Sequence, residues 1–452
     1  MNLRIRLVIA LKFSLYGSYP RRKGVLDLTN IGFQHGSAAG MRIHVLPTKA
    51  FKTFAISLYA GVPLDENTVT PTALIPFVLR RGTANYPETT QFRERLEELY
   101  GAGFGFDIYK RGDYQIVQFR MDTISDSFVQ SKESLLGESF AFLGEVLTKP
   151  LLEAGSFRAS YVATERETVR KKLEAIVNDK IRYAAERCIE EMCRKEPYRL
   201  HPLGQRADLD GITPESLYQS YNSWLGGAIL DLYVVGDTTP EEVEKLVTRH
   251  FGRAHGDPAG YSSNFSPVTV SEVRTVEEKL DVSQGKLNMG LRTSITYKDD
   301  RYASALMYNG ILGGYPHSKL FVNVREKESL AYYASSRYDG HKGIGTIQSG
   351  IETQNYSKAV DIIRKQLDEL QAGNITELEL SQTKAMIRNL LSEIQDSAFE
   401  MISFDFNRQL SGKDRSAQEL LAQVDSTGAE DVKAAAGTFE LDTIYFLTGK
   451  GE

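Results

Sequence analysis

Two periods of apolar and polar residues alternate along this chain. Alternation of apolar and polar residues predicts a strand, as in MRIHVL at the start of residues 41–60 (MRIHVLPTKAFKTFAISLYA), and a Pro-Thr-Lys turn joins it to a second predicted strand, which is more continuously apolar. Apolar stripes with a period near 3.6 residues predict helices, and the longest of these runs over residues 165–194. This mixture indicates an α+β fold in which antiparallel-rich sheets are covered by helices.

The order of the predicted elements is similar in the two halves of the chain. One hairpin is expected to turn at residues 111–113 and another lies within residues 334–351. Residues 252–268 (GRAHGDPAGYSSNFSPV) lack periodicity and are rich in Gly, Pro and Ser, which favours a linker. The other predicted elements are helices over residues 90–99, 131–147, 212–221, 239–251, 303–311, 358–372 and 376–396, and strands over residues 231–237, 286–291 and 443–449.

A shift of 232 positions lays the first half of the chain on the second. It carries Ala73 onto Ala305, and it carries FRERLEELYGA, which begins at Phe92, onto VREKESLAYYA, which begins at Val324, without a gap. Self-similarity in one register predicts two copies of one structural unit. We therefore expect two homologous lobes, and we divide the chain into a basic N-terminal extension (1–23), a first lobe (24–251), a linker (252–274) and a second lobe (275–452).

Residues 62–83 (VPLDENTVTPTALIPFVLRRGT) predict a strand end, an acidic loop and a short, mostly apolar helix. Thr70 is the expected N-cap, Pro71 fits the first turn, and Gly82 fits the end of the helix. Pro76 removes one helical hydrogen bond, which costs about 3 kcal/mol in a helix interior. From this stretch alone, a buried structural helix is the simplest interpretation.

The chain resembles the pitrilysin/insulinase metallopeptidases, also called inverzincins, over nearly everything after residue 24. In active members of that family this helix carries His-x-x-Glu-His shortly before a Gly-Thr pair. The two His bind zinc and the Glu activates a water molecule. Counted back from the Gly-Thr pair, those positions are held here by Ala73, Pro76 and Phe77, which can neither ligate a metal nor move a proton.

Other blocks of the chain carry the same resemblance. HPLGQ, the YVVGD strand end, ILGGYPHSKLF and VREKESLAYY stand in the order in which the family has its blocks. ATERETVRKKLEAI resembles the segment that supplies the third zinc ligand, which would fall on Glu174. Because one carboxylate without two histidines does not hold zinc tightly, we expect Glu174 to be a plain solvated glutamate.

The resemblance to non-catalytic bacterial members of this family implies a subunit without a cofactor of its own. Such a subunit would pair with an active, zinc-bearing homologue as a heterodimer, close a chamber with it and assist in processing peptides, leader peptides among them. Arg325 and Tyr332 match the Arg/Tyr pair that the family places opposite the zinc, where guanidinium and phenol can hold a peptide carbonyl or stabilise an oxyanion. A surface Arg and a packed Tyr are the structural alternative, because Arg93 and Tyr100 occupy the repeat-related positions.

Composition and charge exclude several classes of protein. With 41% hydrophobic and 25% charged residues the chain is an ordinary globular protein with a sizeable core, and a net charge of −5 argues against a general nucleic-acid binder. No run of about 18 apolar residues predicts a membrane span, and the basic start of the chain lacks the cleavage site of a signal peptide. Cys188 and Cys193 match neither a zinc nor a disulfide pattern, which fits the cytoplasm.

Two alternatives to an inactive subunit stay open at this stage. An active peptidase could use unusual ligands, since the seven histidines form no His-x₃-His pair but could still assemble a site from distant positions. A purely structural subunit, like the core subunits of respiratory complexes that share this fold, would not need Arg325 for any activity.

Overall fold

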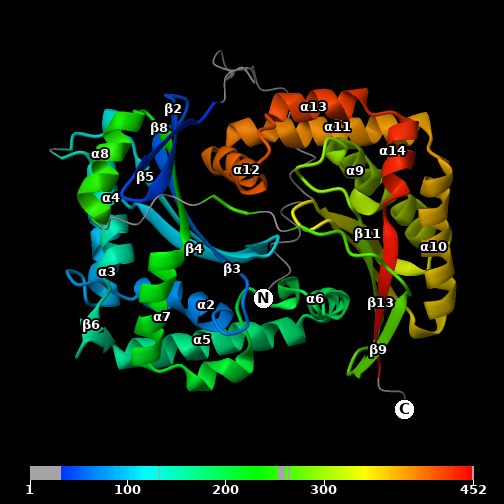
Figure 1. Cartoon of the computed structure of the whole chain (residues 1–452), viewed down its shortest axis with the longest axis horizontal. Coiled ribbons are helices and arrows are strands. Elements are labelled where there is room, and N and C mark those ends of the chain that lie inside the picture. The colour runs from blue at the N-terminus through cyan, green and yellow to red at the C-terminus, as the bar shows by residue number, and fades with distance from the viewer. Residues whose placement is uncertain (1–31, 132, 253–259, 263–264, 450–452) are drawn as a thin grey trace.

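The computed structural model describes residues 32–131, 133–252, 260–262 and 265–449. The basic extension 1–23 lies outside the described residues, as does part of the expected linker 252–274. The described chain forms two large sheets that stand side by side, with helices around and between them (Figure 1), and one small sheet of two strands. Within these residues, no helix combines the length and the apolar character that crossing a bilayer would require.

The first sheet has six strands in the order β1-β2-β8-β3-β5-β4. Its neighbouring strands are antiparallel except β2 and β8, which are parallel. The central strand β3 is buried along most of its length, which explains why its apolar run shows little alternation. The strands are β1 (Gln34–Ala38), β2 (Met41–Pro47), β3 (Thr53–Pro63), β4 (Gly103–Arg111), β5 (Tyr114–Ile124) and β8 (Ile229–Gly236).

The second sheet repeats five of these strands in the same arrangement. Its order is β11-β12-β10-β13-β9, so that β9, β13, β10, β12 and β11 correspond to β2, β8, β3, β5 and β4. The pair β9–β13 is again parallel and the others are antiparallel. The strands are β9 (Arg274–Leu280), β10 (Gly285–Arg292), β11 (Ala331–Asp339), β12 (Ile344–Ile351) and β13 (Glu440–Gly449). The prediction of two homologous α+β lobes is confirmed.

Helices cover both sheets at largely the predicted positions. The helix after β3 is α2 (Val69–Leu79), and the helix after β10 is α9 (Tyr302–Asn309), as the shift of 232 positions requires. The remaining helices of the first half are α3 (Thr89–Glu98), α4 (Leu135–Thr148), α5 (Ala159–Asn178), α6 (Lys180–Met192), α7 (Pro214–Gly227) and α8 (Pro240–Phe251), with the short strands β6 (Leu152–Glu153) and β7 (Ser156–Phe157). Those of the second half are α10 (Tyr356–Ala372), α11 (Glu377–Glu393), α12 (Ala398–Ser411), α13 (Ala417–Ser426) and α14 (Ala429–Ala436), besides π-helical turns over Gly310–Gly314 and Leu320–Lys327.

The predicted long helix over residues 165–194 is wrong, because the structure has two helices there. Asp179, with φ −82° and ψ 87°, leaves the helical region between α5 and α6. Its carboxylate accepts a hydrogen bond from the Arg182 backbone N–H at 3.2 Å and so caps α6. The apolar stripe keeps its period across the break, so periodicity alone could not locate it. Helices α12 to α14 were not predicted at all.

Each half contributes one helix to the core of the other half. Helix α6 places Ala184 and Cys188 against Tyr445 of β13 in the second sheet. In return α12 packs on the first sheet, where the rings of Phe406 and Tyr59 stack with centroids 3.8 Å apart. Both helices lie between the lobes in Figure 1. Because separating the lobes would expose both apolar patches to water, the exchange holds the lobes together.

A largely buried ionic network joins the lobes at the turns of the two repeat-related hairpins. Lys342, in the β11–β12 turn, pairs with Asp113 of the β4–β5 turn at 2.7 Å and with Glu196 at 2.9 Å. Glu196 also accepts a hydrogen bond from Arg292 at 2.5 Å, and Arg292 pairs with Asp442 at 3.1 Å. Burial alone would raise the pKa of Glu196, but the hydrogen bonds from Arg292 and Lys342 outweigh burial and lower it. The network therefore fixes the two hairpins against each other with Glu196 ionised.

Candidate functional site

Helix α2 begins earlier than predicted, and Thr70 is not its N-cap. Thr68 precedes the first helical residue, while the Thr70 hydroxyl donates to Asp208 Oδ2 at 2.6 Å. Gly82 does not adopt a left-handed conformation, and a Cβ at this position would lie 2.5 Å from the carbonyl oxygen of Pro87. Gly82 is thus required by a close backbone approach after the helix, and not by the helix end itself.

The three positions of the metal motif lie in the apolar core. Ala73 and Phe77 are buried, and Pro76 is buried inside the helix. The Phe77 ring meets the Phe106 ring edge-on with centroids 4.8 Å apart, and the Lys172 ammonium lies 5.9 Å from the Phe77 centroid. None of the three side chains offers a ligand atom, so the helix does not fit a zinc ion.

Glu174 is the only carboxylate at a predicted ligand position. Its side chain is 42% exposed and forms an ion pair with Arg206 at 3.1 Å. Glu174 is therefore solvent-exposed, as predicted, but it is paired with an arginine. A pair of this kind contributes at most about 1 kcal/mol to stability. A lone carboxylate with an arginine as its partner does not make a zinc site, and no step of metal chemistry follows from these residues.

Arg325 and Tyr332 both reach the surface. Arg325 lies in the π-helical turn Leu320–Lys327, and its guanidinium stands over the Phe321 ring, 4.6 Å from the centroid. The Tyr332 side chain is 57% exposed, and its hydroxyl donates to Glu352 Oε1 at 2.6 Å. The alternative of a packed core tyrosine is therefore excluded, and both groups are free to contact another molecule. Their role in binding substrate stays a prediction.

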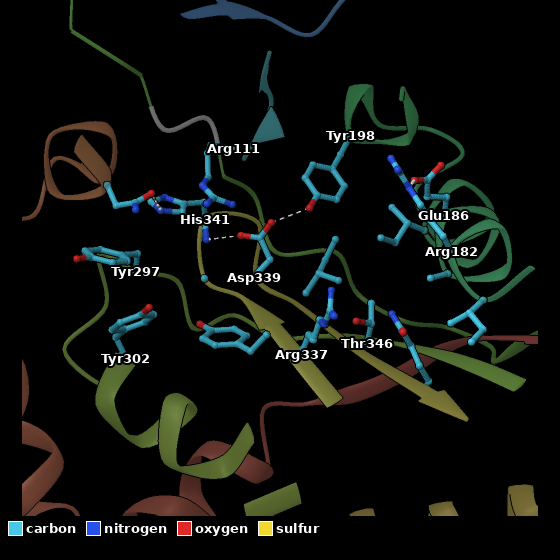
Figure 2. Close-up of a pocket in the computed structure, with 18 of the residues that line it drawn as sticks. Arg111, Arg182, Glu186, Tyr198, Tyr297, Tyr302, Arg337, Asp339, His341 and Thr346 are labelled. Atoms are coloured by element: carbon cyan, nitrogen blue, oxygen red, sulfur yellow. Dashed lines mark hydrogen bonds and ion pairs between the residues drawn. The ribbon is translucent and has the colours of Figure 1, made fainter. Parts of the chain in front are cut away.

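A cavity of about 720 Å³ opens where the two halves of the chain meet (Figure 2). One side is formed by α6, and the other by β11 and β12 with the turn between them. Its volume is typical of sites that bind small ligands or short segments of larger ones. Sequence reasoning missed this cavity, because its residues come from the β4–β5 turn, α6 and the β11–β12 hairpin and share no local motif.

Hydrogen bonds organise the polar groups of this cavity. Asp339 accepts one from the Tyr198 hydroxyl at 2.6 Å and one from the His341 backbone N–H at 2.9 Å (Figure 2). On the opposite side, Arg182 donates to Glu186 at 2.7 Å. Burial raises the pKa of Tyr198 and lowers the pKa of His341, so both side chains are uncharged at neutral pH.

A histidine cluster on the first sheet bears on the alternative of unusual metal ligands. Among the described residues, His35, His44 and Asp405 have ligand atoms within 4.8 Å of one another. The two Nδ1 atoms are 2.7 Å apart, whereas two nitrogens bound to one tetrahedral zinc at about 2.0–2.1 Å stand about 3.3 Å apart. Asp405 already pairs with Arg408 at 2.8 Å, and His44 Nε2 bonds to Asp231 at 2.8 Å. The 2.7 Å separation is that of a hydrogen bond between the imidazoles, and the cluster does not support an active peptidase.

The buried His341 predicts a stability that depends on pH. Its pKa lies below the ordinary value of 6.5, so below pH 6.5 the unfolded chain binds more protons than the folded one. The free energy of unfolding should therefore be level well above pH 6.5, and this residue should lower it by up to about 1 kcal/mol between pH 6.5 and 5.5. Urea unfolding of the wild type and His341→Gln at both pH values measures this, and equal pH dependence in the two proteins would contradict it.

The scaffold and the metal positions together define a class of protein. A protein with this two-lobed α+β fold resembles a metallopeptidase. When the helix that would carry His-x-x-Glu-His has no metal ligands, the protein is a non-catalytic homologue of such an enzyme. Residues 211–387 match the family described as peptidase M16 inactive domain. Over 416 residues the chain is 38% identical to the probable inactive metalloprotease YmfF of Bacillus subtilis (strain 168), covering 92% of this chain and 97% of that protein. The chain belongs to the M16 peptidase family, and the resemblance to the pitrilysin/insulinase metallopeptidases is confirmed.

Solved structures share the fold of this chain. A conserved protein from Enterococcus faecalis V583 has a TM-score of 0.87 and 32% identity, with 93% of this chain and 99% of that chain covered. A peptidase M16 inactive domain from Pseudomonas fluorescens has a TM-score of 0.77 at 18% identity, with 93% and 98% covered, and shows the fold alone. A partial match, 25% identical over 240 residues, relates the chain to the antilisterial bacteriocin subtilosin biosynthesis protein AlbE of Bacillus subtilis (strain 168), covering 53% of this chain and 59% of that protein.

Proposed function

We propose that this chain is the inactive subunit of a heterodimeric zinc metallopeptidase. It forms half of a peptide-binding chamber and assists a zinc-bearing homologue, which supplies the metal and the hydrolysis. The observation that carries this proposal is the combination of a two-lobed scaffold with apolar residues at all three positions of the His-x-x-Glu-His frame. Such a scaffold retains surfaces for a peptide while it has lost the groups that activate water.

The edges of both sheets support the binding of an extended peptide. Within the described residues, β4 bonds only to β5 and β11 bonds only to β12, so each sheet ends in a strand with unpaired backbone groups on one side. An extended peptide can add to such an edge by main-chain hydrogen bonds. Both edge strands also contribute to the cavity between the halves, through Arg111 at the end of β4 and Arg337 on β11.

The substrate class and the compartment are part of the same proposal. AlbE is described as a bacteriocin biosynthesis protein, which supports processing of a peptide, such as the removal of a leader. Cys188 and Cys193 are buried free thiols, which supports a reducing cytoplasm. The negative net charge supports a peptide as the ligand over a nucleic acid.

We expect the purified chain alone to bind no stoichiometric zinc and to cleave no peptide. The reason is that Ala73, Pro76 and Phe77 offer neither a metal ligand nor a base. Elemental analysis and a peptide digestion assay measure this. About one zinc per chain, together with proteolysis that a chelator stops, would contradict it.

The heterodimer is tested by producing the chain together with a homologue from the same genome that carries an intact His-x-x-Glu-His motif. We expect the two to purify as a complex whose peptide cleavage exceeds that of the homologue alone. Replacing the first His of the homologue's motif by Ala serves as the control. This substitution should abolish cleavage while the two chains still purify as a complex. Failure of the two chains to associate, or equal cleavage with and without this chain, would refute the proposal.

A further inference from the structure

Two arginines of the cavity between the halves have no carboxylate partner. Arg111 ends β4, and its guanidinium stands over the Tyr109 ring, 5.2 Å from the centroid. Arg337 lies on the edge strand β11 and is exposed. Figure 2 shows both side chains at the cavity with Asp339 between their positions. Among the described residues, no carboxylate forms an ion pair with either guanidinium.

The carboxylates that line the cavity are already engaged elsewhere. Asp339 accepts hydrogen bonds from Tyr198 and from the backbone of His341, and Glu186 pairs with Arg182. Asp179 accepts the backbone N–H of Arg182 at the start of α6. The acids therefore serve to hold the walls of the cavity. The two arginines are left with donors for a group that comes from outside.

The walls of the cavity are suited to a peptide segment around such a group. Thr346 and Gln348 line it from β12 and offer hydrogen-bonding side chains. Tyr297 and Tyr302 add aromatic surface on the other side, with their ring centroids 4.6 Å apart. The cavity thus combines aromatic contact area, polar groups and two unpaired cations, which is the composition expected of a site that orients a ligand by a few polar contacts.

We propose that this cavity binds the carboxylate of a peptide, with Arg111 and Arg337 as the recognising groups. Guanidinium forms paired hydrogen bonds to a carboxylate, which are stronger than neutral ones and fix its orientation. The carboxylate is either an Asp or Glu side chain or the C-terminus of the peptide, and the chemistry is the same for both. This inference rests on the proposed function, because it names the class of peptide that the chamber takes.

Calorimetry on the full chain with three synthetic octapeptides tests the proposal. The first has two central Glu residues and an amidated C-terminus, the second has Gln in both places and the amide, and the third is the Gln peptide with a free C-terminus. We expect the Glu peptide, the free-carboxyl peptide or both to bind at least about tenfold more tightly than the neutral amide. Tighter binding of the Glu peptide alone assigns the carboxylate to a side chain, tighter binding of the free-carboxyl peptide alone assigns it to the C-terminus, and tighter binding of both shows that the site accepts either. Binding should weaken as salt is added, because the contact is ionic.

Three variants assign the binding to the cavity. Arg337→Gln and Arg111→Gln should each lower the affinity for the carboxylate peptide by about tenfold and leave affinity for the neutral amide unchanged. Arg93→Gln is the matched control, because Arg93 is an exposed arginine on α3 outside the cavity, and it should have no effect. Circular dichroism confirms that each variant is folded.

Equal binding of all three peptides, no binding of any of them, or full affinity in both cavity variants would overturn the inference. None of these results would contradict the proposal that the chain forms a heterodimer with a zinc-bearing homologue. Cleavage of a neutral peptide by the assembled complex would still support the proposed function, whereas loss of complex formation would remove that function independently of peptide charge.

Discussion

Arg325→Ala is expected to lower peptide turnover by the assembled heterodimer by about tenfold to a thousandfold. Removing one oxyanion-stabilising donor from an active site lowers kcat by about a hundredfold to a thousandfold, which sets the upper part of this range. In the complex, Arg325 and Tyr332 should face the zinc of the partner across the closed chamber. The exposed positions of both side chains leave them free to do so, since neither is needed to fill the core.

The fold should tolerate this change. Arg325 contacts the Phe321 ring and leaves no buried group unpaired when it is removed, so the free energy of unfolding should change by less than about 1 kcal/mol. Arg93→Ala is the control, because it removes the repeat-related arginine of the first lobe. If both variants leave cleavage by the heterodimer equally unaffected, the Arg325 and Tyr332 assignment is wrong, and a structural role is favoured.

Tyr332→Phe separates the hydroxyl from the ring. The hydrogen bond to Glu352 raises the pKa of Tyr332, so the phenol stays protonated and can donate at neutral pH. A role in catalysis by the complex predicts lower turnover in Tyr332→Phe with unchanged assembly. Unchanged turnover would show that the hydroxyl takes no part in catalysis by the complex.

Glu196→Ala is expected to destabilise the chain by about 3 kcal/mol. The carboxylate accepts from Arg292 at 2.5 Å and pairs with Lys342 at 2.9 Å, and both cations are largely buried. Removing one member of a buried ionic group leaves the other charges uncompensated, which costs about 3–5 kcal/mol. We expect the lower end because Arg292 keeps Asp442 and Lys342 keeps Asp113.

Urea unfolding at pH 7 measures the effect of this substitution. Glu94→Gln is the control, since Glu94 is exposed on α3, and it should change stability by less than about 0.5 kcal/mol. The pKa of Glu196 is lowered in the folded state, so its contribution is complete above the ordinary value of 4.5 and is lost as the pH falls below it. A Glu196→Ala protein as stable as Glu94→Gln would show that the network does not hold the lobes together.

Most helices up to α11 and the strands of the two central hairpins could be predicted from the order of residues, whereas the break between α5 and α6 and the helices α12 to α14 were not. The 232-position repeat correctly placed α2 and α9 after equivalent central strands, because both copies bury the same faces in the same order. The N-cap was predicted at Thr70, but the N-cap position is Thr68, whose side chain makes no capping hydrogen bond, and Thr70 instead bonds to Asp208 far along the chain. Local capping rules could not foresee that tertiary partner.

The sequence alone determined that the three positions of the metal motif can neither ligate a metal nor transfer a proton, because Ala73, Pro76 and Phe77 lack donor atoms in any conformation. Only the tertiary structure decided how the halves join. The break at Asp179 leaves the apolar period of α5 and α6 intact, so the packing of α6 against the second sheet has no signature in the sequence, and α12, which packs on the first sheet, was not predicted at all. The cavity with Arg111 and Arg337 exists because that exchange and the meeting of two hairpin turns bring distant segments together, and such contacts depend on packing between surfaces and not on the spacing of residues along the chain.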